Sequence, residues 1–68
     1  MKKTYVLAVY CRRGGVSRDA GEHARGEYKS DAEAISNLRA KARGLKRYYD
    51  EVFCTILDKE RRVAEFSV

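Results

Sequence analysis

Residues 30–44 read SDAEAISNLRAKARG, and they decide the fold because they predict a single, clearly delimited helix. Ser30 and Glu33 have the spacing of a capping box. In this motif the serine hydroxyl accepts a hydrogen bond from the Glu33 N–H, and the Glu33 carboxylate reaches back to the serine N–H. Apolar residues then recur at spacings of three and four, which indicates one buried helix face. They are Ile35, Leu38 and Ala42.

Gly44 is expected to end this helix. A glycine just beyond the last helical turn commonly adopts the left-handed conformation, and an apolar residue that follows it contacts the last turn. Leu45 occupies that following position. We therefore expect a helix from about Asp31 to Arg43.

The segments that flank the helix are typical of strands. Thr4–Cys11 is β-branched and aromatic and is too short for a typical helix, and Tyr49–Leu57 forms a second strong strand. After a polar turn at Asp58–Arg61, residues 62–68 complete a hairpin. The apolar residues on one side of this last strand are Ala64, Phe66 and Val68.

The segment between the first strand and the helix is less regular. Residues 12–22 carry three glycines among polar residues and are predicted to form a loop. Residues 23–28 alternate weakly, and we interpret them as a charged edge strand that pairs back on the first strand. The expected element order is therefore strand, weak strand, helix, strand, strand.

This order predicts a small α+β domain, in which an antiparallel sheet of three to four strands carries one helix on one face. The 68 residues are expected to form a single domain, 1–68, with no repeat and no linker. The hydrophobic share of 44% is too high for a disordered chain. A domain of this size buries only about 60% of its unfolded surface, so it often needs additional support such as oligomerisation.

A single helix leaves the second sheet face uncovered, and the alternation predicts that this face is apolar. One interpretation is that it forms the interface of a homodimer. The other is that the loop at 12–22 folds over it, or that strand twist buries it in the core. The residues of this candidate dimer face are Val6, Ala8, Tyr10, Phe53, Thr55 and Leu57.

Basic residues are concentrated around the end of the helix. The chain has a net charge of +5, and the stretch 34–49 contains five basic residues and no acidic one. A local field of one sign favours partners of the opposite sign. The alternative is that these charges serve only solubility and the helix dipole, which bases at a helix end stabilise. The candidate partner-binding residues are Arg39, Lys41, Arg43, Lys46 and Arg47, together with Arg12 and Arg13.

No catalytic motif is present. Residues 13–17 lack the lysine and the spacing of a phosphate loop, and no Gly-x-Ser-x-Gly turn occurs. Cys11 and His23 would form a nucleophile–base pair only if the first hairpin brought them together. Cys11 and Cys54 with a single histidine make a poor zinc set, and we interpret both cysteines as buried, reduced thiols. We expect no enzymatic activity, no cofactor and no metal.

The N-terminus shows no signal-peptide pattern, and its first apolar run is too short to cross a membrane. We therefore expect a cytoplasmic protein that has no membrane partner.

In element order alone, the chain resembles the very small α+β proteins of phages and mobile elements, which include inhibitors of host RNA polymerase and anti-CRISPR proteins. The resemblance implies a non-enzymatic inhibitor or regulator that docks on an acidic protein surface or a nucleoprotein assembly. One alternative is a sequence-tolerant nucleic-acid-binding protein, in which Tyr10, Tyr48 and Tyr49 stack on bases. Against this, Tyr48 and Tyr49 are interpreted as core or hairpin-entry residues. The other is a small homodimeric structural protein.

Overall fold

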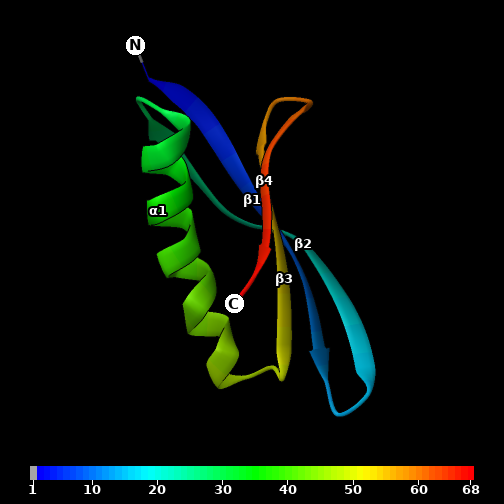
Figure 1. Cartoon of the computed structure of the whole chain (residues 1–68). Coiled ribbons are helices and arrows are strands. Elements are labelled where there is room, and N and C mark those ends of the chain that lie inside the picture. Colours follow the sequence, from blue (N-terminus) through cyan, green and yellow to red (C-terminus); the bar gives the residue numbers. More distant parts are fainter. Residues whose placement is uncertain (1) are drawn as a thin grey trace.

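A computed structural model describes residues 2–68, except for the side chains at positions 19 and 20. The chain forms an antiparallel sheet of four strands with one helix on one face, which confirms the expected α+β fold (Figure 1). The strands follow the order β2-β1-β3-β4 across the sheet. The elements are β1 (Lys3–Arg13), β2 (Val16–Tyr28), α1 (Asp31–Arg43), the 3₁₀ helix η1 (Gly44–Arg47), β3 (Glu51–Asp58) and β4 (Arg61–Ser67).

The expectation of a loop at 12–22 was wrong, because β1 and β2 form a long hairpin that includes this segment. Gly14 and Gly15 make its two-residue turn, with φ of 56° and 81°. Glycine reaches such values without steric cost, and right-twisted strands favour a turn of this kind. The edge strand expected at 23–28 is confirmed, and it extends back to Val16 with register shifts along the way.

The helix has the predicted bounds, Asp31–Arg43. The Ser30 hydroxyl accepts a hydrogen bond from the Glu33 N–H over 3.2 Å, as a capping box requires. The Glu33 carboxylate reaches one residue further back than predicted and accepts from the Lys29 N–H over 3.3 Å. The first bond satisfies one unpaired N–H of the first helical turn, and the second satisfies the N–H of the residue that precedes the cap.

The prediction that Gly44 adopts a left-handed conformation was wrong. Its φ is −61° and its ψ is −27°, so the chain continues directly into η1. The backbone N–H groups of Tyr48 and Tyr49 then donate to the Leu45 carbonyl over 3.0 and 3.1 Å. A tightened 3₁₀ turn thus satisfies carbonyl groups that a left-handed glycine would otherwise satisfy. Because the tyrosines follow this turn, β3 begins two residues later than the predicted strand.

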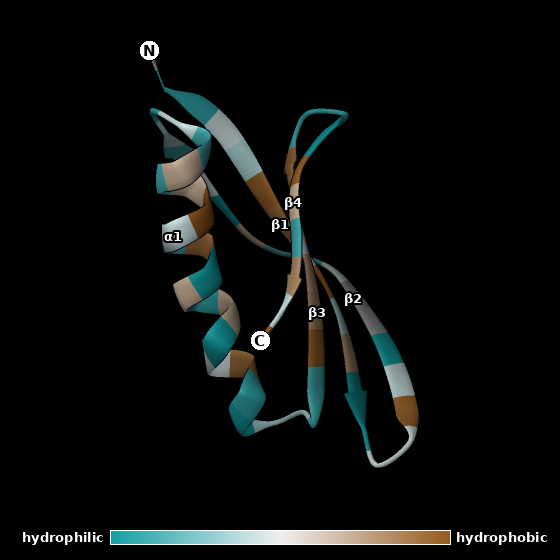
Figure 2. Ribbon diagram, in the orientation of Figure 1, coloured by the Kyte–Doolittle hydropathy of each residue, from teal (hydrophilic) through white to brown (hydrophobic). Residues whose placement is uncertain are grey.

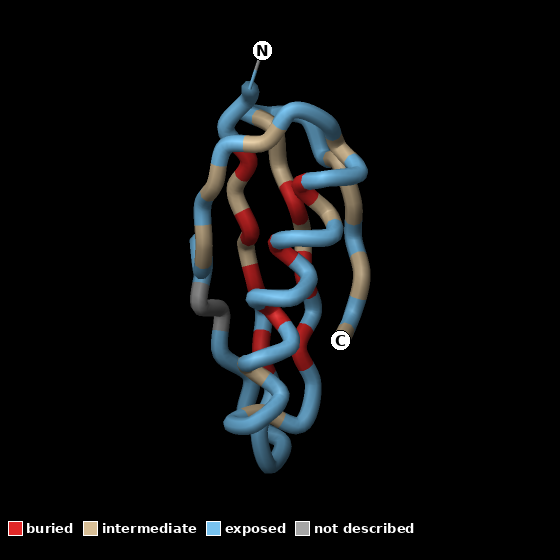
Figure 3. Tube along the Cα trace, turned by 90° about the vertical axis from the view of Figure 1, so that its left-hand side faces the viewer, coloured by how far each residue is buried: buried red, intermediate tan, exposed pale blue. Residues whose placement is uncertain are grey.

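The hydrophobic core lies between α1 and the two central strands (Figure 3). The alternation predicted for both strands is confirmed, with one face of each fully buried. Helix residues Leu38 and Ala42 are buried as expected, whereas Ile35 is only half-buried. The buried residues are Tyr5, Leu7, Val9, Cys11, Ala34, Leu38, Ala42, Val52, Cys54 and Ile56.

The opposite sheet face has no helix or loop over it in the part of the chain that the structure describes (Figure 1). The idea that residues 12–22 fold over this face was wrong, because they extend the sheet as a hairpin. Hydrophilic residues gather at the β3–β4 turn and at the far end of the helix, and hydrophobic residues are concentrated in the middle of the molecule (Figure 2).

Candidate functional site: a cationic end

The end of the molecule where α1 begins is electrically balanced. The Asp31 carboxylate accepts a hydrogen bond from the Tyr5 hydroxyl over 2.7 Å and another from the Arg61 guanidinium over 3.0 Å. Arg61 also forms an ion pair with Asp58 over 3.1 Å, and the Lys3 ammonium lies 3.7 Å from the Asp58 carboxylate. The bonds from Arg61, and then the bond from Tyr5, hold the pKa of Asp31 below its usual value.

Acidic and basic residues occur in equal number at this end. The strand ends, the helix start and the β3–β4 turn bring them together. The bases are Lys2, Lys3, Lys29, Lys59, Arg61 and Arg62, and the acids are Glu27, Asp31, Glu33, Asp58, Glu60 and Glu65, the partner of Arg62.

At the other end, hydrogen bonds hold the tip of the β1–β2 hairpin against the segment that follows η1. The Asp50 carboxylate accepts from the Gly14 N–H over 2.9 Å, and the Asp50 N–H donates to the Arg12 carbonyl over 2.8 Å. The Lys46 ammonium donates to the Asp50 carbonyl over 2.6 Å. Basic residues from two distant segments are thereby gathered at one end of the sheet (Figure 1).

We call Arg13, Arg18, Arg43, Lys46 and Arg47 the cationic end. None of the five lies within ion-pair distance of an acidic side chain that the structure describes. By contrast, Arg12 is neutralised by Glu51 over 3.4 Å.

A niche of about 430 Å³ opens between the hairpin tip and η1. In the register of β1 and β2, Arg18 lies opposite Cys11, whose side chain is in the core. Arg18 therefore projects on the helix side of the sheet, and so does Arg13, two residues after Cys11 on β1. The remaining lining is largely apolar or aromatic. It consists of Val16, Leu45, Tyr48 and Tyr49.

The two tyrosines of this niche differ in burial. Tyr49 packs against the core, whereas Tyr48 is 63% exposed. Of the two, only Tyr48 is therefore free to stack on a ligand. Tyr49 packs as a core residue, and Tyr48 lies at the entry to β3.

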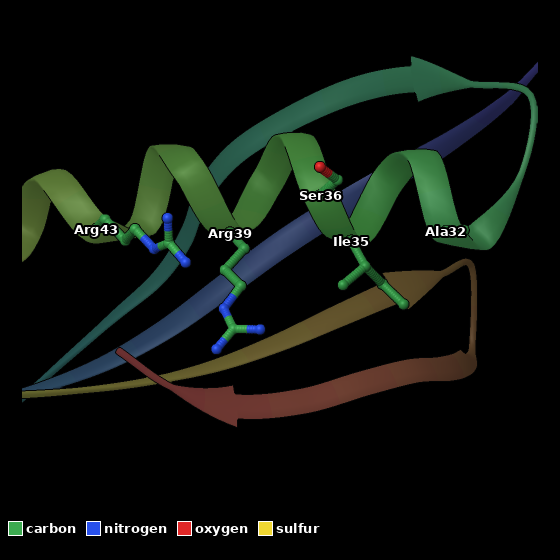
Figure 4. Close-up of a pocket in the computed structure, with 5 residues that line it drawn as sticks. All are labelled: Ala32, Ile35, Ser36, Arg39 and Arg43. Carbon is green, nitrogen blue, oxygen red and sulfur yellow. The ribbon is translucent and has the colours of Figure 1, made fainter.

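A second hollow of about 470 Å³ runs along the flank of α1 (Figure 4). In Figure 4, Ile35 and Arg39 point from the helix toward the β3–β4 side of the sheet. The Arg39 guanidinium carbon lies 5.4 Å from the centre of the Phe66 ring, which is a cation–π contact worth about 0.5–1 kcal/mol at an exposed site. Arg39 thus has an intramolecular role, although its charge remains unpaired by any described acid.

The structure divides the residues predicted to bind a partner. Arg13, Arg43, Lys46 and Arg47 belong to the cationic end, and Arg43 also lines the hollow beside the helix with Arg39. Lys41 is exposed and lines neither hollow. Arg18 was not predicted, because it fell in the supposed loop; the Gly14-Gly15 pair, a hairpin-turn signal, is the feature that identifies its strand.

The first hairpin does not bring the Cys11 and His23 side chains together. Cys11 is opposite Arg18, whereas His23 falls at the register shift beside Leu7 and Ala8. Cys11 and Cys54 are buried free thiols, and burial raises the pKa of each. In the described part of the chain, no three side chains of His, Cys, Asp or Glu are grouped to hold a metal ion.

No family model matches the chain, and neither a curated protein nor a solved structure matches it. No helix among the described residues has the length and apolar character needed to span a membrane.

Proposed function

We propose that this protein is a small, non-enzymatic binding module that docks through its cationic end onto the acidic surface of a larger protein or nucleoprotein assembly. By occupying that surface it acts as an inhibitor or regulator. The observation that carries this proposal is the asymmetry of charge. The helix-start end balances its own charges, whereas none of the five cations of the cationic end lies within ion-pair distance of a described acidic side chain.

The hydrogen bonds of Asp50 add a physical consequence to this asymmetry of charge. They hold the hairpin tip beside the segment that follows η1, so cations from β1, β2 and η1 share one end of the sheet, where like charges repel. An acidic partner removes that repulsion, and long-range attraction to the cationic end accelerates the encounter.

A second candidate function is sequence-tolerant binding of single-stranded nucleic acid. Tyr48 favours it, because an exposed aromatic ring beside Arg13 and Arg18 combines a stacking surface with cations for the backbone. Such binding weakens steeply as salt is added, because each neutralised phosphate releases counterions.

The test uses two variants with the same net charge. Arg13→Glu with Arg47→Glu reverses two of the five charges of the cationic end, and Lys2→Glu with Lys59→Glu reverses two cations at the balanced end. Immobilised wild type and both variants are exposed to a nuclease-treated lysate of the source cells, and the captured proteins are identified and then purified for affinity measurements. We expect the control variant to keep the wild-type affinity and the cationic-end variant to lose at least tenfold, about 1.4 kcal/mol.

Equal losses in both variants would show that only net charge matters and would contradict the proposal. The second candidate is tested with labelled single-stranded DNA of mixed sequence. Absence of binding at low salt eliminates this second candidate. Two results together favour it over the acidic protein partner: the Arg13→Glu, Arg47→Glu variant no longer binds the DNA, and the wild type retains no protein from the nuclease-treated lysate.

A further inference from the structure

The face of the sheet opposite α1 carries a continuous uncharged strip along its two central strands. Tyr10 is 40% exposed and Phe53 is 44% exposed, and their ring centroids lie 6.3 Å apart. The other side chains of the strip are half-buried. We call this strip the sheet face; it consists of Val6, Ala8, Tyr10, Phe53, Thr55 and Leu57.

Ion pairs surround the sheet face, and each is neutral by itself. Cross-strand register places their members on the same side as the strip: Arg25 is opposite Val6, and Glu65 is opposite Thr55. The pairs come from β2, from β4 and from the hairpin-tip end of β1 and β3. They are Glu22–Arg25 at 2.6 Å, Arg62–Glu65 at 3.0 Å and Arg12–Glu51 at 3.4 Å.

This arrangement contrasts with the rest of the molecule. The chain carries a net charge of +5, so two copies repel each other when they approach through most of their surface. Each basic side chain around the sheet face is neutralised by the acidic member of its own ion pair. The register places one other described charge on this side of the sheet, the acid Glu27, which lies opposite Thr4. This face therefore lacks the positive field that keeps copies apart at the cationic end.

We propose that the sheet face is the interface of a homodimer, in which the sheets of two copies pack face to face with both α1 helices outside. An apolar centre with a polar rim is the usual anatomy of a protein interface. Sheets packed in this way lie about 10 Å apart. The inference does not rest on the proposed function, because the cationic end lies outside this face.

The shape of the sheet face suits a two-fold interface, which must be complementary to itself. Beside the raised rings of Tyr10 and Phe53 lies a hollow of about 200 Å³, lined by both rings and by Ala8, Val9 and Thr55. A projecting ring on one copy therefore meets a hollow of matching character on the other.

The broad face of the molecule is also large enough for a stable dimer interface. It measures 42 × 21 × 15 Å along its principal axes, so its broad face can supply the roughly 800 Å² that each partner buries in a standard interface. Its accessible surface of 4751 Å² exceeds the about 4,400 Å² expected of a monomer of its mass.

Sedimentation equilibrium from the micromolar to the millimolar range tests the proposal. We expect the mass to rise from 7.8 kDa toward twice that value as concentration increases, and the dimer to persist or tighten in high salt, which screens the repulsion between copies. Tyr10→Lys with Phe53→Lys should keep the protein monomeric. The matched control, Val16→Lys with Tyr48→Lys, adds the same charge on the helix side and should still dimerise.

A wild-type protein that stays at 7.8 kDa throughout overturns the proposal, as does a Tyr10→Lys, Phe53→Lys variant that dimerises normally. A second measurement covers the case in which that variant fails to fold. On dilution of the wild type, NMR signals of the backbone amides of the sheet face should shift while those of α1 stay constant. Shifts confined to α1 or to the cationic end would locate the contact elsewhere and contradict the inference.

Discussion

The Gly14 backbone N–H donates a hydrogen bond to the Asp50 carboxylate over 2.9 Å, across 36 positions of the sequence. This bond, with the one between the Asp50 N–H and the Arg12 carbonyl, fixes the hairpin tip beside the end of η1. These bonds of a single acidic residue therefore help to fix the separation between the cations on the hairpin and the cations after the helix, together with the pairing of β1 and β3.

Asp50→Ala is expected to loosen this connection. The Gly14 N–H loses its acceptor, which costs about 1 kcal/mol of unfolding free energy. Hydrogen exchange at the Gly14 amide should accelerate, and affinity for an acidic partner should fall as the cationic end spreads. Asp50→Asn is the control, because it keeps an acceptor oxygen at this position. Unchanged exchange at Gly14 in Asp50→Ala would show that the backbone contacts alone hold the tip.

The Asp31 carboxylate gives the stability of the protein an acid-side pH dependence. Its pKa in the folded state lies below the ordinary value of 3.8, chiefly because Arg61 and then Tyr5 donate hydrogen bonds to it. Stability from this group is therefore complete above pH 3.8 and is lost as the pH falls through the depressed folded-state pKa. Asp31→Asn should lower the melting temperature by a few degrees at pH 7, and the difference from wild type should shrink steadily below pH 3.8.

Thermal unfolding followed by circular dichroism between pH 2 and pH 7 checks this expectation. Glu65→Gln is the control, because its exposed pair with Arg62 is of the kind that contributes little to stability. A difference between Asp31→Asn and wild type that is equal at both ends of the pH range would mean that the missing bond, and not the charge, is responsible.

The fold was predictable because its main signals are local. Ser30 and Glu33 mark the start of the helix, and the alternation along residues 4–11 and 52–57 identifies the buried faces. The hairpin at 12–22 was missed because an edge strand tolerates polar residues and glycines, so its sequence resembles a loop. The conformation of Gly44 was also missed, because the turn that follows it depends on hydrogen bonds from Tyr48 and Tyr49.

The candidate site was only partly predictable for a related reason. A run of basic residues is visible in the sequence, but the acids that neutralise some of them are not. Arg12 is paired with Glu51 because β1 and β3 are in a particular register. Arg18 joins the cationic end because the hairpin folds it back beside η1. Both facts are tertiary and have no local sequence signal.

Leu38 and Ile35 provide a test of where the core ends. Leu38 is fully buried, so Leu38→Ala should cost about 2–5 kcal/mol through lost burial and the remaining cavity. A domain of this size has a total stability of about 3–10 kcal/mol, so this substitution should remove a large part of it. Ile35 lies at the edge of the core and lines the hollow beside α1, so Ile35→Ala should cost clearly less. Urea titration of both variants measures the difference, and equal losses would contradict this boundary of the core.

A substitution at Gly44 tests whether this residue has the left-handed conformation that the sequence predicts or the right-handed conformation of the structure. In a left-handed cap, Gly44→Ala would be strained and would destabilise the protein. In the right-handed conformation observed here, a Cβ at this position meets nothing within 4 Å. Alanine then restricts the unfolded chain and suits a helical residue better, so Gly44→Ala should raise the unfolding free energy by about 0.5–1 kcal/mol.

Gly15→Ala is the matched control for this prediction. Its Cβ also has open space, but its φ of 81° strains any side chain, so alanine should destabilise the hairpin by about 1 kcal/mol or more. Urea unfolding of the two variants should therefore show midpoint shifts of opposite sign. A destabilised Gly44→Ala would mean that the helix ends at a left-handed glycine and that η1 does not form. The positions of Lys46 and Arg47 at the cationic end would then have to be revised.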